Sequence, residues 1–570
     1  MRKWICFLLM ILLYSDALAN QLSQGDNDLS PFDFGLSSAQ NGIERYKALL
    51  NTHRSALKAG VNVDYSGIDT IRIEIPEKAQ RIPLTQNNDF KGCVFVVKNT
   101  SRKTWLFDKK SRQDSIEVEK QQIDAGDFRS LKQLRKGRYL LVIEDENLWV
   151  KNRRGYSYGH PRKDILMVED GIAKNTVVMP YNNEYSKPKC TFIRLKGKPL
   201  VFKNLTVLRD SECTFVTHVA SIVGFDDVRI SNVNIKTPES NLNADRGIRL
   251  YDCTNVTMED VLIEGTFSQS NHSGYGINLE NVWNFKAKRL YGKAKWGVFG
   301  NNNVNTVLIE DSRINRFDIH CYGKDVSFKG VEFFDLYNQY SSVYGTISYD
   351  GCTFTDFVPV LNGGSYNAYV GHEVIFKDCV INATSKKNFL FKMSGMWQNA
   401  NERNELTVKC LPNVFIKNMT INMADGAKEL YLFYCSPAIM RVSDIDFLSN
   451  INIDGFYIVE NSETPVGSIF LSNVNMQTKR PVDCTLKNMK IFRVKSGTNE
   501  VVEKHDAVEL KANMPIKRGK IRMKNVRNVV FVRSNQASLL CFSINRITIY
   551  PIVISLFLAI IIGAKRFVKR

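Results

Sequence analysis

The chain has 570 residues, of which 44% are hydrophobic and 24% are charged, and its formal net charge is +19. This composition excludes an intrinsically disordered polymer, because so many hydrophobic residues can bury a large core. The excess of Lys and Arg favours polyanionic partners, although the same charge also serves solubility.

The N-terminus has the features of a secretory signal peptide. Arg2 and Lys3 precede an apolar run, Trp4–Tyr14, and the small-x-small sequence Ala17–Ala19 follows. The run is too short to span about 30 Å of hydrocarbon, which argues against a membrane helix. We therefore expect residues 1–19 to be a cleaved signal peptide. In an exported protein, an acidic polysaccharide, a teichoic-type polymer or an anionic membrane is a better partner for a basic surface than nucleic acid is.

The segment Asn41–Ala59 is predicted to be an amphipathic helix. Its apolar side is formed by Ile43, Tyr46, Leu49, Leu50 and Leu57. A strand-like segment, Thr70–Ile75, comes next. Such a helix can cover the open end of a stack of strands, where unpaired strand edges would otherwise promote aggregation.

From residue 200 to residue 374 an eight-residue pattern begins again every 19 to 29 residues, and two further copies begin at residues 414 and 469. Positions one, three, six and eight are apolar, with Ser312 the one polar sixth residue of the good copies. The copies are Leu200–Val207, Val228–Ile235, Val256–Ile263, Val307–Ile314, Val326–Phe333, Ile347–Phe354, Val374–Ile381, Val414–Ile421 and Ile469–Met476, with a looser match at Phe285–Gly292. Position five is Asn204, Asn232, Asp260, Asp311, Gly330, Gly351, Asp378, Asn418 and Asn473. These residue types tolerate a left-handed backbone, so each copy predicts a strand, a one-residue corner and a second strand.

This repeat resembles the pectate-lyase-like superfamily of right-handed parallel β-helices. The resemblance implies an all-β, single-stranded right-handed parallel β-helix over residues 190–535. The N-terminal capping helix and a C-terminal transmembrane segment are predicted from the residues themselves. Residues 20–189 would then form the cap and the first coils, since Arg138–Tyr181 resembles the first coils of tail-associated and secreted members. Neither leucine-rich repeats nor propeller blades have this spacing.

The twelve cysteines are irregularly spaced and lack a zinc-type or CxxC pattern. Export would permit disulfides, but their pairing does not follow from the sequence. We expect no metal and no cofactor, because no phosphate-binding glycine loop, metal-ligand cluster or nucleophile elbow was found.

The segments between residues 245 and 322 predict a polar and aromatic strip. If Ile248, Ile277, Val298 and Ile319 point inward, an outward column follows, formed by Arg249, Asn278, Phe299 and His320. A neighbouring column is formed by Arg246, Tyr275, Trp296 and Phe317, with Asp318 beside it. Aromatic rings cover pyranose faces, and planar polar groups bind hydroxyls and carboxylates, which makes the strip a candidate polysaccharide site. Partly buried aromatics with solvated charges would give the same pattern.

The stretch Asn315–Gly323 resembles an Arg-Phe-Asp-x-His-Cys sequence that recurs in uncharacterised secreted and phage-associated β-helix proteins. Asp318 and His320 lie two residues apart, so in a strand they share a face and can form an acid/base pair or a structural hydrogen bond. The candidate catalytic residues are Asp318, His320 and Asp245, with Glu280 in reserve. The candidate substrate-binding residues are Arg246, Arg249, Tyr275, Asn278, Trp296 and Arg316. Hydrolysis would need two carboxylates about 5 to 9.5 Å apart, and elimination would need a base and a cation.

The C-terminal segment Ile547–Ala564 is uncharged, apolar and long enough for one membrane crossing, and the basic residues of 565–570 follow it. A final strand of the fold is the alternative. The sequence thus predicts an exported protein, anchored in the membrane with its bulk extracellular or periplasmic. We expect it to bind or act on an acidic polysaccharide as a lyase or hydrolase, or alternatively to serve as a non-catalytic adhesin or envelope-structural protein.

Overall fold

The computed structural model describes residues 28–533 apart from the gaps 101–103, 151–159, 179, 185, 196, 214–216, 238–245, 266–274, 295, 336, 341–342, 356–360, 364–372, 384–386, 394–409, 424–428, 436–445, 448–449, 461–467, 473–482, 495–500, 504–507, 513–520 and 527–528. The predicted signal peptide and membrane anchor lie outside these residues. Within the part that is described, no helix is long and apolar enough to cross a membrane.

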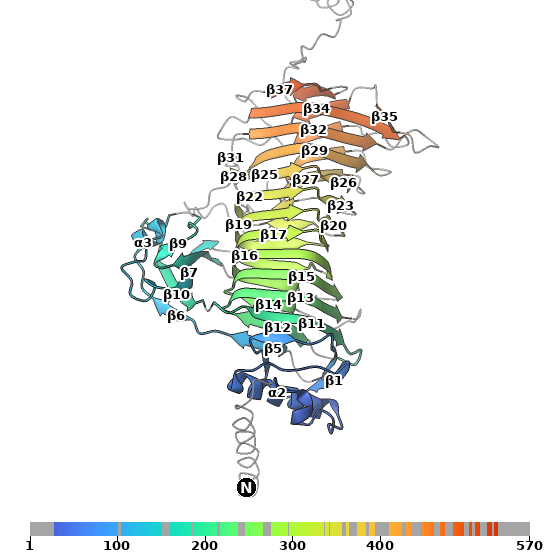
Figure 1. Cartoon of the computed structure of the whole chain (residues 1–570). Coiled ribbons are helices and arrows are strands. Elements are labelled where there is room, and N and C mark those ends of the chain that lie inside the picture. The colour runs from blue at the N-terminus through green and yellow to red at the C-terminus, as the bar shows by residue number, and fades with distance from the viewer. Residues whose placement is uncertain are drawn as a thin grey trace, which may run out of the picture.

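Most of the chain winds into a stack of coils in which each strand pairs in parallel with its equivalent in the next coil (Figure 1). One series of strands carries the predicted repeat: β11 (Leu200–Arg209), β13 (Asp226–Thr237), β15 (Thr254–Gly265), β16 (Tyr275–Ala294), β17 (Phe299–Glu310), β19 (Phe317–Lys329), β22 (Val343–Asp350), β25 (Glu373–Lys377), β29 (Asn413–Met423), β32 (Asn450–Glu460), β34 (Asp483–Val494) and β37 (Ile521–Lys524). It begins with β1 (Thr70–Ile75), β3 (Asn87–Asp89) and β4 (Val94–Asn99).

A second series forms another face of the coils and includes the beginnings of β16, β17 and β19. Its other strands are β2 (Ile82–Pro83), β5 (Thr104–Lys110), β12 (Thr217–Val223), β14 (Arg246–Tyr251), β21 (Asn338–Tyr340), β24 (Leu361–Gly363), β27 (Lys387–Met393), β30 (Glu429–Cys435), β33 (Ser468–Ser472), β36 (Val508–Ala512) and β38 (Val529–Arg533). Short strands after the corners complete the coils: β18 (Arg313–Ile314), β20 (Glu332–Phe333), β23 (Thr353–Thr355) and β26 (Val380–Ala383). Outside these series, β35 (Val501–Glu503) pairs antiparallel with β34, and β28 (Cys410–Leu411) pairs with β31 (Asp446–Phe447).

The predicted register of the repeat is confirmed. The first residues of successive copies are direct partners, in the order Leu200, Val228, Val256, Phe285, Val307, Val326, Ile347, Val374 and Val414. Each predicted corner residue that the structure describes has a positive φ, between 46° at Asp311 and 62° at Gly351. Corner amides also bond from coil to coil, as Asn232 Nδ2 does to Asn204 Oδ1 at 3.0 Å. Asn and Asp therefore both permit the turn and link consecutive coils.

The ninth copy, Ile469–Met476, was assigned to the wrong face. Its strand β33 pairs with β30 and β36 in the second series. After Asn418 the corners are at Gly455, Asn488 and Asn525, whose φ values are 80°, 53° and 54°. Strands of both faces alternate apolar and polar residues, so the pattern does not distinguish them. Asn473 itself lies outside the described residues.

The core consists of side chains stacked from coil to coil. The rings of Phe328, Tyr349 and Phe376 stack in sequence with centroids 5.0 Å apart and interplanar angles of 12° and 7°. Each such ring pair adds about 0.5–1.5 kcal/mol beyond the buried area. Because a parallel stack repeats every 4.8 Å or so, one aromatic residue per coil at the same position suffices to build this column.

The predicted capping helix is present as α2 (Gly42–Ala59), which follows the 3-10 turn η1 (Pro31–Phe34) and lies against β1 at the first coil (Figure 1). Its inner side buries Tyr46, Leu49 and Leu50, as expected. Leu57 was expected on the same side but is 45% exposed. Ala56 is the last residue of the helix that is buried.

The expectation that Arg138–Tyr181 forms the first coils is wrong. This region belongs to an antiparallel sheet of β6 (Asp114–Ile116), β10 (Pro188–Arg194), β7 (Arg138–Val150), β8 (His160–Glu169) and β9 (Ile172–Ala173), joined by α3 (Lys120–Ala125). We call it the insertion. It has its own hydrophobic core and interrupts the first coils between β5 and β11.

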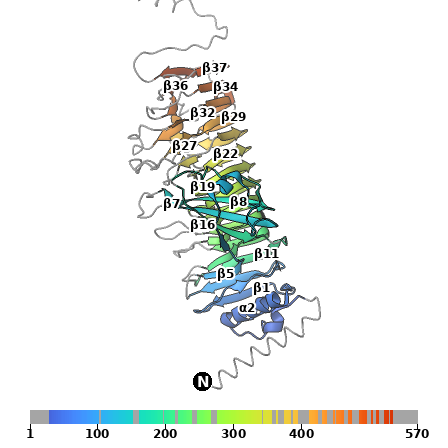
Figure 2. The same cartoon turned by 90° about the vertical axis from the view of Figure 1, so that its left-hand side faces the viewer.

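The insertion lies beside the coils, with β8 against β16, β17 and β19 (Figures 1 and 2). Trp283 packs against a hydrophobic cluster of the insertion, and Arg138 forms an ion pair of 2.7 Å with the buried Asp226. Strands β7 and β8 each contain an unbroken apolar run, Tyr139–Ile143 and Ile165–Val168, which fits a buried strand of either kind of sheet. Their antiparallel pairing therefore could not be inferred from periodicity.

Candidate functional site

The predicted strip exists, but its register differs from the expected one. Direct strand partners place Ile248, Ile277, Phe299 and Phe317 in one inward column and Arg249, Asn278, Gly300 and Asp318 in the adjacent outward column. Phe299 and Phe317, which were expected to point outward, are fully buried with their ring centroids 5.1 Å apart. The expected pairing of Ile248 with Ile277 is observed, but Phe299 takes the place expected for Val298 and Phe317 the place expected for Ile319. The alignment is thus displaced by one and by two residues in these two coils.

Gly300 makes room for Tyr275 in the outward column. A Cβ atom at position 300 would overlap the Tyr275 ring, so the ring lies directly over this glycine. The side chain of Tyr275 is thereby laid along the coil surface, between the strand that carries it and the strand that carries Asp318. Only glycine at this position permits that approach.

The Tyr275 hydroxyl group joins three other side chains. It donates a hydrogen bond of 2.8 Å to Asp318 Oδ2 and accepts one of 2.8 Å from Trp296 Nε1. His320 Nε2 lies 2.6 Å from the same oxygen. The single phenolic proton is used toward the carboxylate, so His320 Nε2 must carry a proton and donate it to the hydroxyl oxygen. The network thus selects the Nε2-protonated form of the imidazole.

Asp318 and Arg316 form a buried ion pair beneath this network. Arg316 Nε donates to Asp318 Oδ1 at 2.6 Å, and its Nη2 donates to Gln339 Oε1 at 3.0 Å. Asp318 is 0% exposed and Arg316 is 4% exposed. Burial raises the pKa of Asp318 above its usual value, although Arg316 and Tyr275 oppose this rise. Burial also raises the pKa of the Tyr275 hydroxyl.

Two aromatic rings flank the Arg316 guanidinium. Its central carbon lies 5.1 Å from the ring centroid of Trp296 and 5.0 Å from that of Tyr337, distances typical of cation–π contacts. The same guanidinium donates to the Trp296 carbonyl at 3.2 Å. The Trp296 side chain is nevertheless 44% exposed. Its indole is therefore fixed from below and at its N–H, while part of the ring faces solvent.

The structure brings together Tyr275, Trp296, Arg316, Asp318 and His320, which were all predicted site residues. Sequence reasoning missed Gly300, Gln339 and Tyr337, although the short polar and aromatic segment Tyr337–Tyr340 was visible as a further coil. We call the surface formed by Trp296, Tyr337 and His320 the aromatic platform.

The remaining predicted residues lie around this cluster or outside it. Arg249 is half-buried, 3.7 Å from Glu280, and lies over the Tyr251 ring. Asn278 is buried and donates from Nδ2 to the Gly300 carbonyl. The backbone of Arg246 pairs with that of Tyr275, and Asp245 lies outside the described residues. Among the residues that the structure describes, no group of three or more His, Cys, Asp or Glu side chains could hold a metal ion.

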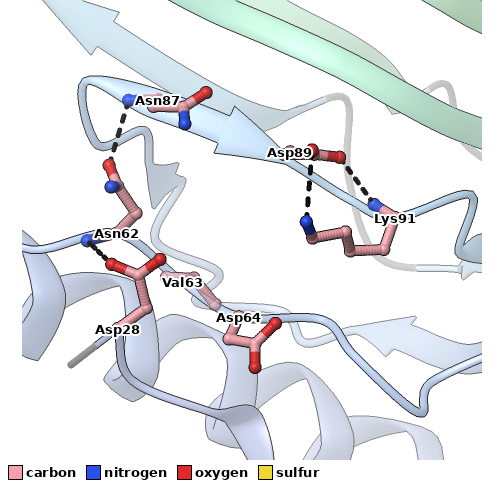
Figure 3. A pocket seen from close by; sticks show the side chains of 7 residues that line it. All are labelled: Asp28, Asn62, Val63, Asp64, Asn87, Asp89 and Lys91. Atoms are coloured by element: carbon pink, nitrogen blue, oxygen red, sulfur yellow. Dashed lines mark hydrogen bonds and ion pairs between the residues drawn. The ribbon is translucent and has the colours of Figure 1, made fainter.

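A polar pocket of about 550 Å³ lies elsewhere, where the first coil meets the segments flanking α2 (Figure 3). Its lining residues are Asp28, Asn62, Val63, Asp64, Asn87, Asp89 and Lys91. Their polar groups are largely used within the protein. Asp89 pairs with Lys203 at 3.2 Å and accepts from Asn204 at 2.8 Å. The residues around the pocket thus connect the cap with the first corner, Asn204. None of the predicted site residues lines the pocket.

Comparisons with protein-family models and with curated protein sequences gave no match. Among solved structures, the chain is similar to the tailspike gp61 of Pseudomonas phage phi297, with a TM-score of 0.51, 12% identity, and coverage of 85% of this chain and 84% of that one. The chain is a right-handed parallel β-helix. This β-helix is also similar to the Gp54 tailspike of Acinetobacter baumannii bacteriophage AP22, solved in complex with A. baumannii capsular saccharide, with a TM-score of 0.41, 12% identity, and coverage of 81% and 79%. A further similar structure is PfbA, a surface adhesin of Streptococcus pneumoniae, with a TM-score of 0.31, 9% identity, and coverage of 91% and 97%.

Proposed function

We propose that this β-helix binds a polysaccharide on the outer face of its coils, at the aromatic platform. The observation that carries the proposal is the exposed Trp296 ring, which is held in place by the Arg316 guanidinium and by its N–H bond to Tyr275. A ring fixed before binding loses little conformational entropy when a pyranose face packs on it.

Polar groups for sugar hydroxyls and carboxylates lie on the neighbouring positions. His320 is half-buried beside Trp296, and the half-buried Arg249 and Glu280 lie on preceding coils. A guanidinium can bind a carboxylate through two hydrogen bonds. Together with the net charge of +19, this favours an acidic polymer. The stacked coils, a fold shared with the gp61 tailspike, provide an extended surface for a chain of sugars.

Binding without cleavage is favoured over hydrolysis. A hydrolase needs two accessible carboxyl groups, whereas Asp318 is completely buried and both its oxygens are hydrogen-bonded. Glu280 is the accessible carboxylate nearest in the strip. We therefore assign Asp318 and Arg316 a positioning role beneath the platform. Elimination is the second candidate function, favoured by the fixed His320 imidazole, and the release of unsaturated uronate would detect it by ultraviolet absorbance.

We also propose export and membrane anchoring, supported by the sequences of residues 1–19 and 547–564. Protease added to cells whose outer envelope has been opened, but whose plasma membrane is intact, would then degrade the β-helix. Protection of the full-length protein under these conditions would contradict this topology.

The binding proposal is tested with the full chain and a panel of acidic and neutral polysaccharides. Trp296→Ala should weaken binding at least tenfold, since an aromatic anchor that the bound sugar covers contributes more than about 1.4 kcal/mol. Phe32→Ala is the matched control, because Phe32 has the same 44% exposure but lies in η1. Equal affinity of both variants and the parent chain would overturn the proposal.

A further inference from the structure

Two cysteines occupy the same position in consecutive coils. Cys352 directly follows the corner Gly351, and Cys379 directly follows the corner Asp378. The next residues, Thr353 and Val380, are direct strand partners. Val380 N donates to the Cys352 carbonyl at 2.9 Å, so the two cysteines are adjacent along the axis of the β-helix.

Both thiols point into the core. Cys352 is 0% exposed and Cys379 is 1% exposed, and both are free thiols. The Cys352 thiol donates to the Phe328 carbonyl at 3.6 Å, and the Cys379 thiol donates to the Tyr349 carbonyl at 3.4 Å. Neighbouring parallel strands lie about 4.8 Å apart, which falls within the range of about 4.4 to 6.8 Å between the Cα atoms of a disulfide. In the strand pairings that the structure describes, no other two cysteines face each other in this way.

We propose that Cys352 and Cys379 form a disulfide that staples two consecutive coils when the chain folds in the presence of a small-molecule disulfide. One thiolate attacks the disulfide reagent to give a mixed disulfide and releases one reduced thiol. The second thiolate then attacks the protein sulfur of the mixed disulfide, forms the Cys352–Cys379 bond and releases the second reduced thiol. Two protein thiols are oxidised, one reagent disulfide is reduced, and their two protons end on the released thiols.

The burial of the pair indicates when these steps take place. Because both sulfurs are shielded from solvent in the folded coils, the reaction takes place during folding or during local opening. Once formed, the bond resists reductants as long as the coils stay closed.

The experiment is to unfold and reduce the full chain, refold it with glutathione disulfide or with dithiothreitol, and alkylate all thiols after denaturation. Peptide mapping should find the Cys352 and Cys379 peptides linked only in the oxidised sample, whose melting temperature should be higher by several degrees. Cys484→Ser is the matched control, since Cys484 is buried between Ile451 and Ile521 and should not affect the link.

Cys352→Ser should leave Cys379 unlinked to any other cysteine of the chain under both conditions, either alkylated or joined to glutathione. A correctly folded oxidised sample, shown by circular dichroism, in which both cysteines are alkylated would overturn the proposal. This result is independent of polysaccharide binding, because the pair is buried in the core and contacts none of the platform residues described above.

Discussion

An arginine, an aspartate and a tyrosine form a buried network in each of two parts of the molecule, the insertion and the β-helix. In the insertion, Arg162 pairs with Asp164 at 3.2 Å, and the Tyr181 hydroxyl donates to the same carboxylate at 2.9 Å. In the β-helix, Arg316, Asp318 and Tyr275 repeat this arrangement. Both arginines lie two residues before their aspartate, and all six residues are at most 5% exposed.

The two networks differ in what lies above them. In the insertion the Arg162 guanidinium packs 3.8 Å from the Tyr181 ring itself, which closes the network on its own members. In the β-helix the guanidinium packs on Trp296 and Tyr337, and Trp296 remains 44% exposed. The shared triad is thus a structural unit, and only the added aromatic residues turn one copy into a candidate binding surface.

The largest expected effect comes from removing either arginine. Arg162→Met and Arg316→Met each leave a buried carboxylate without its cation, which costs about 3–5 kcal/mol of folding free energy. Chemical unfolding of each variant measures this loss. Polysaccharide binding should be abolished by Arg316→Met and retained by Arg162→Met under conditions where both are folded. Equal loss of binding in both variants would show that the two networks do not differ in function.

Asp252 is a buried carboxylate of the β-helix that, unlike Asp318, forms no ion pair with an arginine among the pairs that the structure describes. It is 0% exposed at a left-handed corner, and its Oδ2 atom has no hydrogen-bond partner. Burial raises its pKa from 3.8 to about 7, partly opposed by the hydrogen bond from Asn281 and by the charges of Lys163 and Arg249. Glu280 adds to the rise.

Since the folded state keeps this proton up to about pH 7 and the unfolded chain loses it near pH 4, stability should fall as pH rises through this window and stay low above it. Asp252→Asn should therefore raise stability at pH 8 by about 2–4 kcal/mol and leave pH 3 nearly unchanged. Asn already occupies the equivalent corners 281 and 303. Thermal unfolding at both pH values checks this, with the exposed corner variant Asp311→Asn expected to show no such difference.

The third test concerns the slot for Tyr275. Gly300→Ala places a methyl group in the space of the Tyr275 ring and should cost about 1–3 kcal/mol of folding free energy. The displaced ring would also release Trp296 Nε1, so polysaccharide affinity should fall with stability. Gly197→Ala is the control, because a Cβ atom there meets nothing within 4 Å. Unchanged affinity in Gly300→Ala would show that binding at the aromatic platform does not depend on the position of the Tyr275 ring.

The comparison also explains which features could be predicted from the sequence. The repeat predicted the register of the coils from Leu200 to Val414, because Asn, Asp and Gly at each corner permit the left-handed turn between two alternating strands. It failed at Ile469, where the same alternation belongs to the other face. The insertion was missed because strands such as β7 have the same periodicity whether they pair in parallel or antiparallel. Five site residues were identified from residue type alone. Their contacts depend on Gly300 and on loop lengths, neither of which the pattern of side chains reveals.

The smallest effect should come from removing one hydroxyl group from each network. Tyr181→Phe and Tyr275→Phe each delete a buried hydrogen bond to a carboxylate and should destabilise the fold by about 1–3 kcal/mol at most. Their effects on binding should differ, since Tyr275 also holds the Trp296 indole and His320, whereas the Tyr181 network has no exposed aromatic ring. Calorimetric titration should show weaker binding for Tyr275→Phe and parental affinity for Tyr181→Phe. Parental affinity in both would mean that Arg316 alone is sufficient to hold the platform.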